Sequence, residues 1–325
     1  MLGEATDYGH PLIHNQVLSY TTKRHVIGQD VLEPTCWCVH SILQVIRQRA
    51  GRLETPVMES LQNKVTIITG GGAGIGRETA LLFAKYGAKL VLADLNISGA
   101  EAVAVECKKA GLSEDDVLAV EANITNEDDR KKVIDECISK FGRLDVLINN
   151  AGIGRFAPLS QTPSDMYDSL MDLNVKAQLY ITQLAVPHLK ASKGNIVNLA
   201  SIVAEEAMPY TGVYGMTKAA VAMFTKTLAL EMAQFGVRVN EVRPGVVFTN
   251  FYDGMTGGNT EILQKTMMGE NSKHPMGRLP KTEEIANAIA FLASDMASFT
   301  TGNALYVDGG RHCVGAGFAS RPMTA

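Results

Sequence analysis

The sequence lacks the features that would assign it to several specialised classes of protein. Its 325 residues carry 30 basic and 34 acidic side chains, a formal net charge of -4, so no polybasic surface for nucleic acid is expected. Hydrophobic residues make up 46% of the chain and charged residues only 20%, which excludes a disordered chain. We therefore expect an ordinary globular protein without a nucleic-acid partner.

Cysteine is scarce and its arrangement is uninformative. The five cysteines contain no Cys-x-x-Cys pair and are widely scattered, at Cys36, Cys38, Cys107, Cys137 and Cys313. This spacing predicts neither a metal site nor a disulfide framework. A reducing compartment, the cytoplasm, fits best.

Long apolar runs are also missing. The longest candidate near the start, residues 37–46, is interrupted by His40, Ser41 and Gln44, so no membrane span is expected. Residues 1–57 lack the pattern of a secretory signal, and their three arginines near position 50 are offset by five acidic residues. A mitochondrial transit peptide, which is poor in acidic residues, is therefore less well supported than a cytoplasmic location.

From Lys64 onward, short apolar runs alternate with stretches of helical periodicity, which is typical of βαβ units in a parallel sheet. Seven strands are predicted, at residues 65–69, 90–94, 117–123, 146–149, 195–201, 237–242 and 304–307. Long helices are predicted at 163–190, 214–234 and 283–297. The pattern indicates one α/β domain of about seven parallel strands with helices on both faces.

Two further helices have sequence signals at their ends. Ser98 with Glu101 and Thr125 with Asp128 have the spacing of capping boxes, which predicts helix starts at these points. The first helix should end at Gly111, and Gly142 should terminate the second. 

A glycine-rich segment, TGGGAGIG at residues 69–76, lies between the first strand and the next helix. Glycines there allow a tight turn and close approach to a pyrophosphate, whose charge meets the helix N-terminus. This predicts a doubly wound, Rossmann-type sheet that binds a dinucleotide, although a tight turn without a ligand is the simpler alternative.

An acidic residue, Asp94, ends the second predicted strand. A carboxylate at this position can accept hydrogen bonds from the adenosine ribose and repel a 2′-phosphate, so NAD is favoured over NADP. Two alternatives remain: Asp94 could be a simple turn residue, and Arg77 could instead accept a 2′-phosphate.

Tyr214 and Lys218, in YGMTK, lie four residues apart in a predicted helix and therefore on one face. A tyrosine with an ordinary pKa of about 10 is a poor base at neutral pH, but a nearby positive charge lowers that pKa. An exposed surface pair is the alternative. Ser201, thirteen positions before Tyr214, and Asn174, in MDLNV, are the companions that favour catalysis.

With these residues the sequence resembles the classical short-chain dehydrogenase/reductase family, from Leu61 to about His312. TGGGAGIG is similar to the family's TGxxxGxG, and the matching segments are NNAG at residues 149–152, RPGVVFT at 243–249 and the last-strand motif ending in DGG at 308–310. The resemblance implies an oxidoreductase with the catalytic residues Asn174, Ser201, Tyr214 and Lys218. The cofactor contacts that it implies are Gly70, Gly72, Gly74, Ile75, Gly76, Asp94, Asn123, Ile124, Asn150, Ala151, Gly152, Tyr214, Lys218, Pro244, Gly245, Val247 and Thr249.

The resemblance also implies a role for each catalytic residue. Ser201 would hold the substrate oxygen, and Tyr214 would exchange a proton with it. Lys218 would lower the pKa of Tyr214 and bind the nicotinamide ribose, while Asn174 would hold a water that connects Lys218 to solvent.

Three positions depart from the family pattern. Asn123 replaces an aspartate that contacts the adenine amine, so we expect a weakened contact through its amide oxygen. Glu205 replaces a glycine; we expect it at the surface, with the substrate entrance as the alternative. Ala200 replaces a frequent second serine without consequence.

Residues 248–278 are long and irregular, as expected of a substrate lid. An apolar pocket is predicted from Phe251, Tyr252, Met255, Met267, Met268 and Met276, with Ile153, Phe156, Met208 and Tyr210 as further candidates; packing of the lid onto the body is the alternative. We expect a medium-sized apolar secondary alcohol or ketone as substrate. An NADPH-dependent 3-oxoacyl thioester reductase and a catalytically silent dinucleotide sensor are the competing interpretations.

The domain organisation follows from these assignments. We expect an N-terminal extension over residues 1–57, poorly ordered, the nucleotide-binding domain over 58–315, and a tail over 316–325. By analogy with the family, a homodimer or homotetramer should form through the helices at 163–190 and 214–234.

Overall fold

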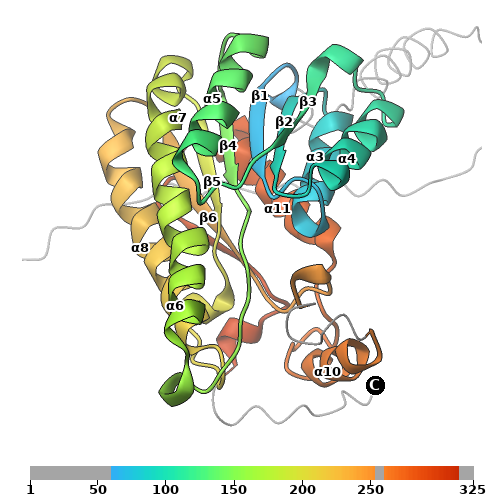
Figure 1. The fold of residues 1–325 in the computed structure, drawn as a ribbon, viewed down its shortest axis with the longest axis vertical. Coiled ribbons are helices and arrows are strands. Elements are labelled where there is room, and N and C mark those ends of the chain that lie inside the picture. The colour runs from blue at the N-terminus through green and yellow to red at the C-terminus, as the bar shows by residue number, and fades with distance from the viewer. Residues whose placement is uncertain (1–59, 253–259, 315–325) are drawn as a thin grey trace, which may run out of the picture. The chain divides into compact units, whose positions relative to one another are not determined.

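The computed structural model describes residues 60–252 and 260–314, which form a parallel sheet covered by helices on both faces (Figure 1). The strands are β1 (Val65–Thr69), β2 (Lys89–Asp94), β3 (Val117–Glu121), β4 (Val146–Asn149), β5 (Asn195–Leu199), β6 (Arg238–Pro244) and β7 (Ala304–Val307). They are ordered β3-β2-β1-β4-β5-β6-β7, and every neighbouring pair is parallel. The predicted doubly wound fold is confirmed, whereas residues 1–57 and 316–325 lie outside the described residues.

Side chains alternate between the two faces of the sheet and build a core on each. On β2, Leu90 and Leu92 pack with helices α3 (Gly74–Lys85), α4 (Ile97–Lys109) and α11 (Thr282–Ala293). Val91 and Ala93 point the other way, toward α5 (Glu127–Phe141), α7 (Gln178–Ser192) and α8 (Gly212–Ala233). Because both faces are covered, the strands read as continuous apolar runs, and this made them predictable.

Both predicted capping boxes are wrong, although the helices exist. The Asn96 side chain caps α4 by accepting a hydrogen bond from the Gly99 amide, and Asn126 caps α5 by accepting from the Asp128 and Asp129 amides. Asparagine is among the strongest N-cap residues, and it replaces Ser98 and Thr125 in this role. The predicted stop at Gly142 is confirmed by its left-handed φ of 72°.

The predicted helix over residues 163–190 contains a change of winding. It consists of α6 (Ser164–Met171), a π-helical segment at Asp172–Ala177 and α7. Single π turns inside α-helices occur mostly at functional positions. Asn174 lies in this segment, so the irregularity marks a predicted catalytic residue.

Two strands end earlier than expected because a polar side chain turns the backbone. β3 stops at Glu121, since Asn123 accepts hydrogen bonds from the amide and hydroxyl of Thr125. β5 stops at Leu199, since Ser201 becomes the cap of the short helix Ile202–Ala204.

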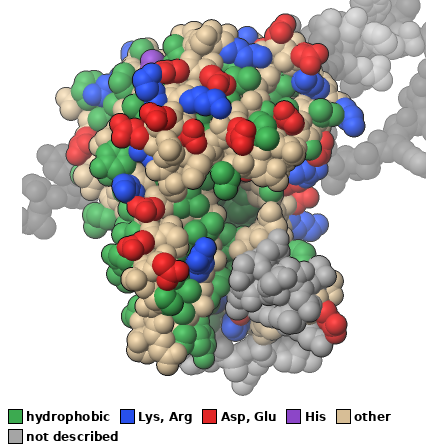
Figure 2. Space-filling view, viewed as in Figure 1, with side chains coloured by type: hydrophobic (Ala, Val, Ile, Leu, Met, Phe, Trp, Pro, Cys, Tyr) green, Lys and Arg blue, Asp and Glu red, His purple; other side chains and the backbone are tan. Residues whose placement is uncertain are grey.

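The carboxyl ends of all seven strands meet at one edge of the sheet, where the loops after β1, β4, β5 and β6 converge. The strand order reverses between β1 and β4, which is where ligands bind in doubly wound sheets. Figure 2 shows a hollow in this region with hydrophobic side chains in its floor. No described helix is long and apolar enough to cross a membrane.

Candidate active site

The loop after β1 has the geometry of a phosphate cradle. Gly70 adopts a left-handed φ of 65°, which favours glycine. A methyl group on Gly76 would lie 2.0 Å from the Gly70 carbonyl oxygen, so only glycine lets α3 begin this close to the turn. Gly74 starts α3 and presents its N-terminal amides at the sheet edge. These positions agree with a pyrophosphate site.

The loop after β4 is tied to this cradle. The Asn150 amide side chain donates to the carbonyls of Thr69 and Gly70 at 2.9 and 3.0 Å. The Thr69 hydroxyl accepts from the amides of Asn150 and Ala151, both at 3.1 Å. The NNAG segment therefore fixes the strand ends on both sides of the switch point. 

Asp94 lies beside the glycine loop. Its carboxylate accepts from the Gly72 amide at 2.8 Å and from the Asn96 amide at 2.9 Å. Arg77 is engaged elsewhere, in ion pairs with Glu78 and Glu106. The Arg77 guanidinium is thus paired with two carboxylates and does not pair with Asp94.

Two predicted cofactor contacts, Asn123 and Ile124, have few unused polar atoms that could bind a ligand. The Asn123 amide oxygen already accepts two hydrogen bonds from Thr125, at 3.1 and 2.8 Å, so its NH₂ group is what remains. The Ile124 side chain is buried in the core, and its carbonyl accepts from Arg130. A contact through Ile124 would have to use its backbone amide.

The segment after β6 reaches across to the glycine loop. A methyl group on Gly74 would lie 3.5 Å from the Thr249 methyl, while Gly245 donates to the Val307 carbonyl. Pro244 and Val247 are buried. Thr249 and Gly245 therefore border the site, and Pro244 and Val247 shape its backbone.

The four predicted catalytic residues come together at the same edge. The Lys218 ammonium donates to the Leu199 carbonyl at 2.7 Å and lies 5.6 Å from the centre of the Tyr214 ring. Ser201 lies two residues after the end of β5 and close enough to Tyr214 to act on the pKa of its hydroxyl. Asn174 is fully buried. Its side-chain oxygen accepts from the backbone amide of Ile153, and its side-chain NH₂ group donates to the Ile153 carbonyl and the Thr217 hydroxyl.

The electrostatics differ in part from the expectation. Burial of its hydroxyl raises the pKa of Tyr214, with Tyr252 adding to the rise and Ser201 opposing it. Burial also lowers the pKa of Lys218 to about 8, against the attraction of Glu241. The sequence predicted that Lys218 lowers the pKa of Tyr214, whereas burial is the main cause here and raises it.

Aromatic rings surround Tyr214 on the substrate side. Phe156 lies 6.1 Å from Tyr214 between ring centres, and Phe251 lies 5.6 Å from it. Tyr252 stacks on Phe156 and meets Phe251 edge to face. We call Phe156, Phe251 and Tyr252 the aromatic wall.

The other predicted pocket residues are less well placed. Tyr210, Met268 and Met276 are more than 60% exposed, and Met208 contacts Arg311 through its sulfur. Met255 and the Met267 side chain lie outside what is described. Among the described candidates, the three aromatic residues are those shown to surround Tyr214.

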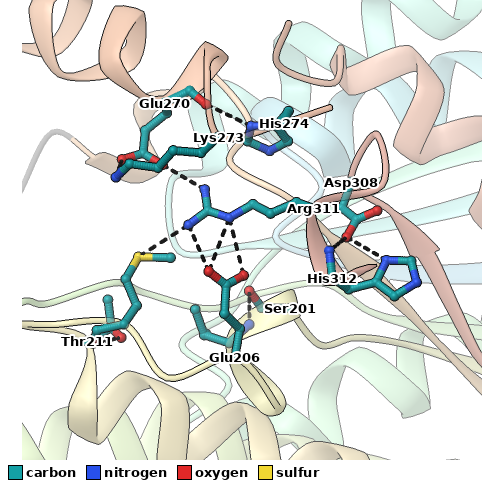
Figure 3. Close-up of polar contacts among 11 residues, drawn as sticks. Ser201, Glu206, Thr211, Glu270, Lys273, His274, Asp308, Arg311 and His312 are labelled. Atoms are coloured by element: carbon teal, nitrogen blue, oxygen red, sulfur yellow. Dashed lines mark hydrogen bonds and ion pairs between the residues drawn. The ribbon is translucent and has the colours of Figure 1, made fainter. Parts of the chain in front are cut away.

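An ion-pair network beside the wall was not predicted (Figure 3). The Arg311 guanidinium, on a side chain only 5% exposed, bonds Glu206 and Glu270, while Lys273 pairs with the same Glu270. Arg311 follows the DGG turn after β7, and no neighbour in sequence indicates its partners. Only the fold brings residues 206, 270 and 311 together.

Glu205 lies at the surface, with its side chain 59% exposed, but it is not unpaired. It accepts from the Tyr306 hydroxyl at 2.6 Å and pairs with Arg243, which also bonds the buried Glu241. These interactions lower the pKa of Glu205. Glu205, Arg243 and Glu241 therefore form a connected series of charged side chains, with Arg243 between the two carboxylates.

Comparison with known proteins identifies the group. The family model described as Enoyl-(Acyl carrier protein) reductase matches residues 70–312. The 3-oxoacyl-[acyl-carrier-protein] reductase FabG of Thermotoga maritima is 38% identical over 251 residues, covering 77% of this chain and 98% of that protein. 

Solved structures agree. A short-chain dehydrogenase/reductase of unknown function from Caenorhabditis elegans, solved with cofactor, has a TM-score of 0.75 at 38% identity, covering 79% of this chain and 98% of its own. The 3-ketoacyl-(acyl-carrier-protein) reductase of Brucella melitensis, complexed with NADH, has a TM-score of 0.70 at 38% identity, covering 78% and 100%. This chain belongs to the short-chain dehydrogenase/reductase family. It is an oxidoreductase of that family, as the motifs implied.

Proposed function

We propose that this short-chain dehydrogenase/reductase transfers a hydride between NAD and a medium-sized apolar secondary alcohol or ketone. The observation that carries the proposal is the convergence of Tyr214, Ser201 and Lys218 on the strand edge that also holds the glycine loop. An intact set of this kind argues against a catalytically silent sensor.

Each residue has a chemical role that its surroundings support. Ser201 donates to the substrate oxygen and holds it beside the Tyr214 hydroxyl, which gives a proton to a ketone or takes one from an alcohol. The nicotinamide, when bound, supplies or accepts the hydride. Asn174 fixes the loop after β4 against α8 through Ile153 and Thr217, and its water contact remains a prediction.

The environment of Tyr214 favours a particular starting state. Because burial raises its pKa, the phenol is protonated at neutral pH and is ready to donate to a ketone. For alcohol oxidation the phenolate must form, and the positive charge of the oxidised nicotinamide would stabilise it together with Lys218.

Two charged residues support NAD over NADP. Asp94 is held beside Gly72, where a carboxylate bonds the ribose hydroxyls and repels a 2′-phosphate. Arg77, the basic residue next to the loop, is already bonded to two glutamates. The Brucella melitensis relative in complex with NADH points in the same direction.

The aromatic wall supports an apolar substrate. Phe156, Phe251 and Tyr252 give the side of the site next to Tyr214 large hydrophobic surfaces, and a ring or alkyl group gains most from burial against them.

A 3-oxoacyl thioester reductase is the second candidate, favoured by the name of the Thermotoga maritima relative. Its substrate also presents an alkyl chain and a ketone, so the wall accepts both. The two candidates differ in the need for a carrier, which normally docks through complementary charge.

We also propose a homodimer or homotetramer. On α8, Met216, Met223 and Leu230 recur every seven residues and are 49%, 63% and 82% exposed, so they form one apolar stripe. Tyr180 and Leu184 are further exposed apolar side chains, on α7. Exposed apolar stripes of this size mark protein interfaces, and one copy of the helix pair can cover another.

The experiment that tests the proposed function is a panel of ketones, alcohols and 3-oxoacyl thioesters, assayed with NADH and NADPH by absorbance. Turnover of apolar ketones with NADH is expected to exceed that of thioesters with NADPH. A preference for acyl-carrier thioesters over the matching free ketones would favour the second candidate, and no turnover with any member would revive the sensor.

A further inference from the structure

Arg311 joins two segments that flank the substrate side of the site. Its Nε and Nη2 donate to the Glu206 carboxylate at 3.1 to 3.3 Å, and its Nη1 donates to the Glu270 carboxylate at 2.6 Å. Glu206 belongs to the loop that connects Ser201 to Tyr214. Glu270 lies in the last turn of helix α10 (Thr260–Asn271). We call Arg311, Glu206 and Glu270 the Arg311 clamp (Figure 3).

The clamp is buried enough for its charges to matter. The Arg311 side chain is 5% exposed and that of Glu270 15% exposed. Burial works against the charge of Arg311, yet its bonds to Glu206 and Glu270 raise its pKa overall, while Lys273 and Arg311 lower the pKa of Glu270. Arg311 and Glu270 therefore keep their charges, and their contact is a charge-assisted hydrogen bond.

The end of α10 is also packed on the segment that carries Arg311. The Met276 amide donates to the Gly309 carbonyl at 3.2 Å, and His274 donates from Nδ1 to the Glu270 carbonyl at 2.8 Å. These bonds hold the backbone after α10 against the DGG turn. The clamp adds a third segment to this contact, the loop before Tyr214.

The clamp acts on the catalytic tyrosine through one intermediate. Burial is the main cause that raises the pKa of Tyr252; Glu270 adds to the rise and Arg311 opposes it, so both charges lie near that phenol. Tyr252 in turn packs on Phe156 and Phe251, which contact Tyr214. A shift of α10 would therefore move the aromatic wall.

We propose that Arg311 is a positioning residue for the substrate: by bonding Glu206 and Glu270 it holds α10 and the aromatic wall at a fixed distance from Ser201 and Tyr214. The inference rests on the proposed function for its kinetic part. Among the described contacts, none of the three clamp residues bonds the glycine loop, so we expect NADH binding to change less than substrate binding.

The charges left behind predict how each variant behaves. Arg311→Gln leaves two carboxylates facing one another, which repel, and α10 should move away. Glu270→Gln keeps the shape and leaves Arg311 bonded to Glu206, so its effect should be smaller. Arg311→Lys keeps the charge but loses the fork that reaches two carboxylates at once, so it should rescue the Gln variant only in part.

Hydrogen exchange tests the structural half without any substrate. In Arg311→Gln, the amides of residues 260–271 should exchange about tenfold faster, with about threefold in Glu270→Gln. Arg143→Gln is the matched control, because Arg143 makes a two-bonded pair with Asp145 before β4, away from the clamp; it should leave α10 unchanged. Unchanged exchange in a folded Arg311→Gln protein would overturn the proposal. If that variant does not fold, unchanged exchange in Glu270→Gln would do the same.

Kinetics test the functional half with the best ketone of the panel. Arg311→Gln should raise the KM for the ketone about tenfold, change kcat less than threefold and leave the Kd for NADH, measured by fluorescence, within twofold. The double variant Arg311→Gln/Glu270→Gln should be less impaired than the sum of its parts, since it removes one of the two repelling charges. A parallel loss of NADH affinity would contradict a substrate-side role. If the wild type turns over nothing, the proposed function fails, and hydrogen exchange still decides whether the clamp exists.

Discussion

Replacing Asp94 by Asn should convert the cofactor preference, because we propose that its carboxylate bonds the adenosine ribose and repels a 2′-phosphate. The amide keeps the size of the side chain, and its oxygen can still accept from the Gly72 amide, now bonded at 2.8 Å. Loss of charge weakens the bonds to the ribose hydroxyls by about 1.4 kcal/mol, or about tenfold in kcat/KM with NADH. The glycine loop itself should keep its shape.

The gain with NADPH comes from removing repulsion. Two unit charges about 5 Å apart near a protein surface repel by about 3 kcal/mol, which salt at physiological strength reduces to about 2 kcal/mol, or about 30-fold. The ratio of kcat/KM values for NADPH and NADH should therefore rise about 300-fold, since the two effects multiply.

Steady-state kinetics with both cofactors and one ketone measure this ratio. Asp116→Asn is the matched control, because Asp116 pairs with Lys89 before β3, at the opposite edge of the sheet; its ratio should not change. A wild type that already prefers NADPH, or a ratio in Asp94→Asn that stays within threefold of wild type, would refute the role of Asp94.

Three further changes test other parts of the account. Lys218→Met should abolish turnover yet raise the free energy of unfolding at pH 7 by about 2 kcal/mol. Burial that lowers the Lys218 pKa from 10.5 to about 8 costs the folded protein about 3 kcal/mol. The variant avoids this cost but loses the hydrogen bond to the Leu199 carbonyl, which is worth about 1 kcal/mol. Since the pKa of Lys218 is lower in the folded protein, the cost of burying it is full below pH 8 and fades between pH 8 and 10.5. Denaturant titrations should therefore show that the extra stability of the variant shrinks over that pH range. A variant that is less stable than the wild type at pH 7 would contradict this. Leu230→Glu should reduce the mass by light scattering from a multiple of 35.0 kDa toward that value, and a wild type already at that mass would remove the proposed oligomer. A chain that starts at Met58 should keep the wild-type kcat/KM, and a folded but inactive truncation would show that residues 1–57 are required.

Most of the sheet was predictable because most strands are buried on both faces and are flanked by glycine or polar residues. β1, β4 and β7 have the predicted bounds. Helix starts were less predictable: asparagine and serine or threonine are all good caps, and only the backbone decides which side chain reaches the free amides. The π turn at Asn174 has no signal in a helical pattern.

Some residues of the site were likewise predictable from the sequence, and others were not. Residues within one motif, such as Tyr214 and Lys218, were predictable because helix geometry alone places them together. The Arg311 clamp was not, since its members are 41 to 105 positions apart in sequence and meet only through the order of strands. The pKa of Tyr214 was also misjudged, because its burial depends on the aromatic wall and not on Lys218.

Tyr214→Phe tests the central claim most directly, with Tyr252→Phe as a control that removes a neighbouring hydroxyl from the same wall. The account predicts that Tyr214→Phe lowers kcat for the best ketone by at least about 10³-fold, while its Kd for NADH stays within twofold and Tyr252→Phe keeps most of the activity. Turnover of Tyr214→Phe within tenfold of wild type would contradict the proposed proton transfer.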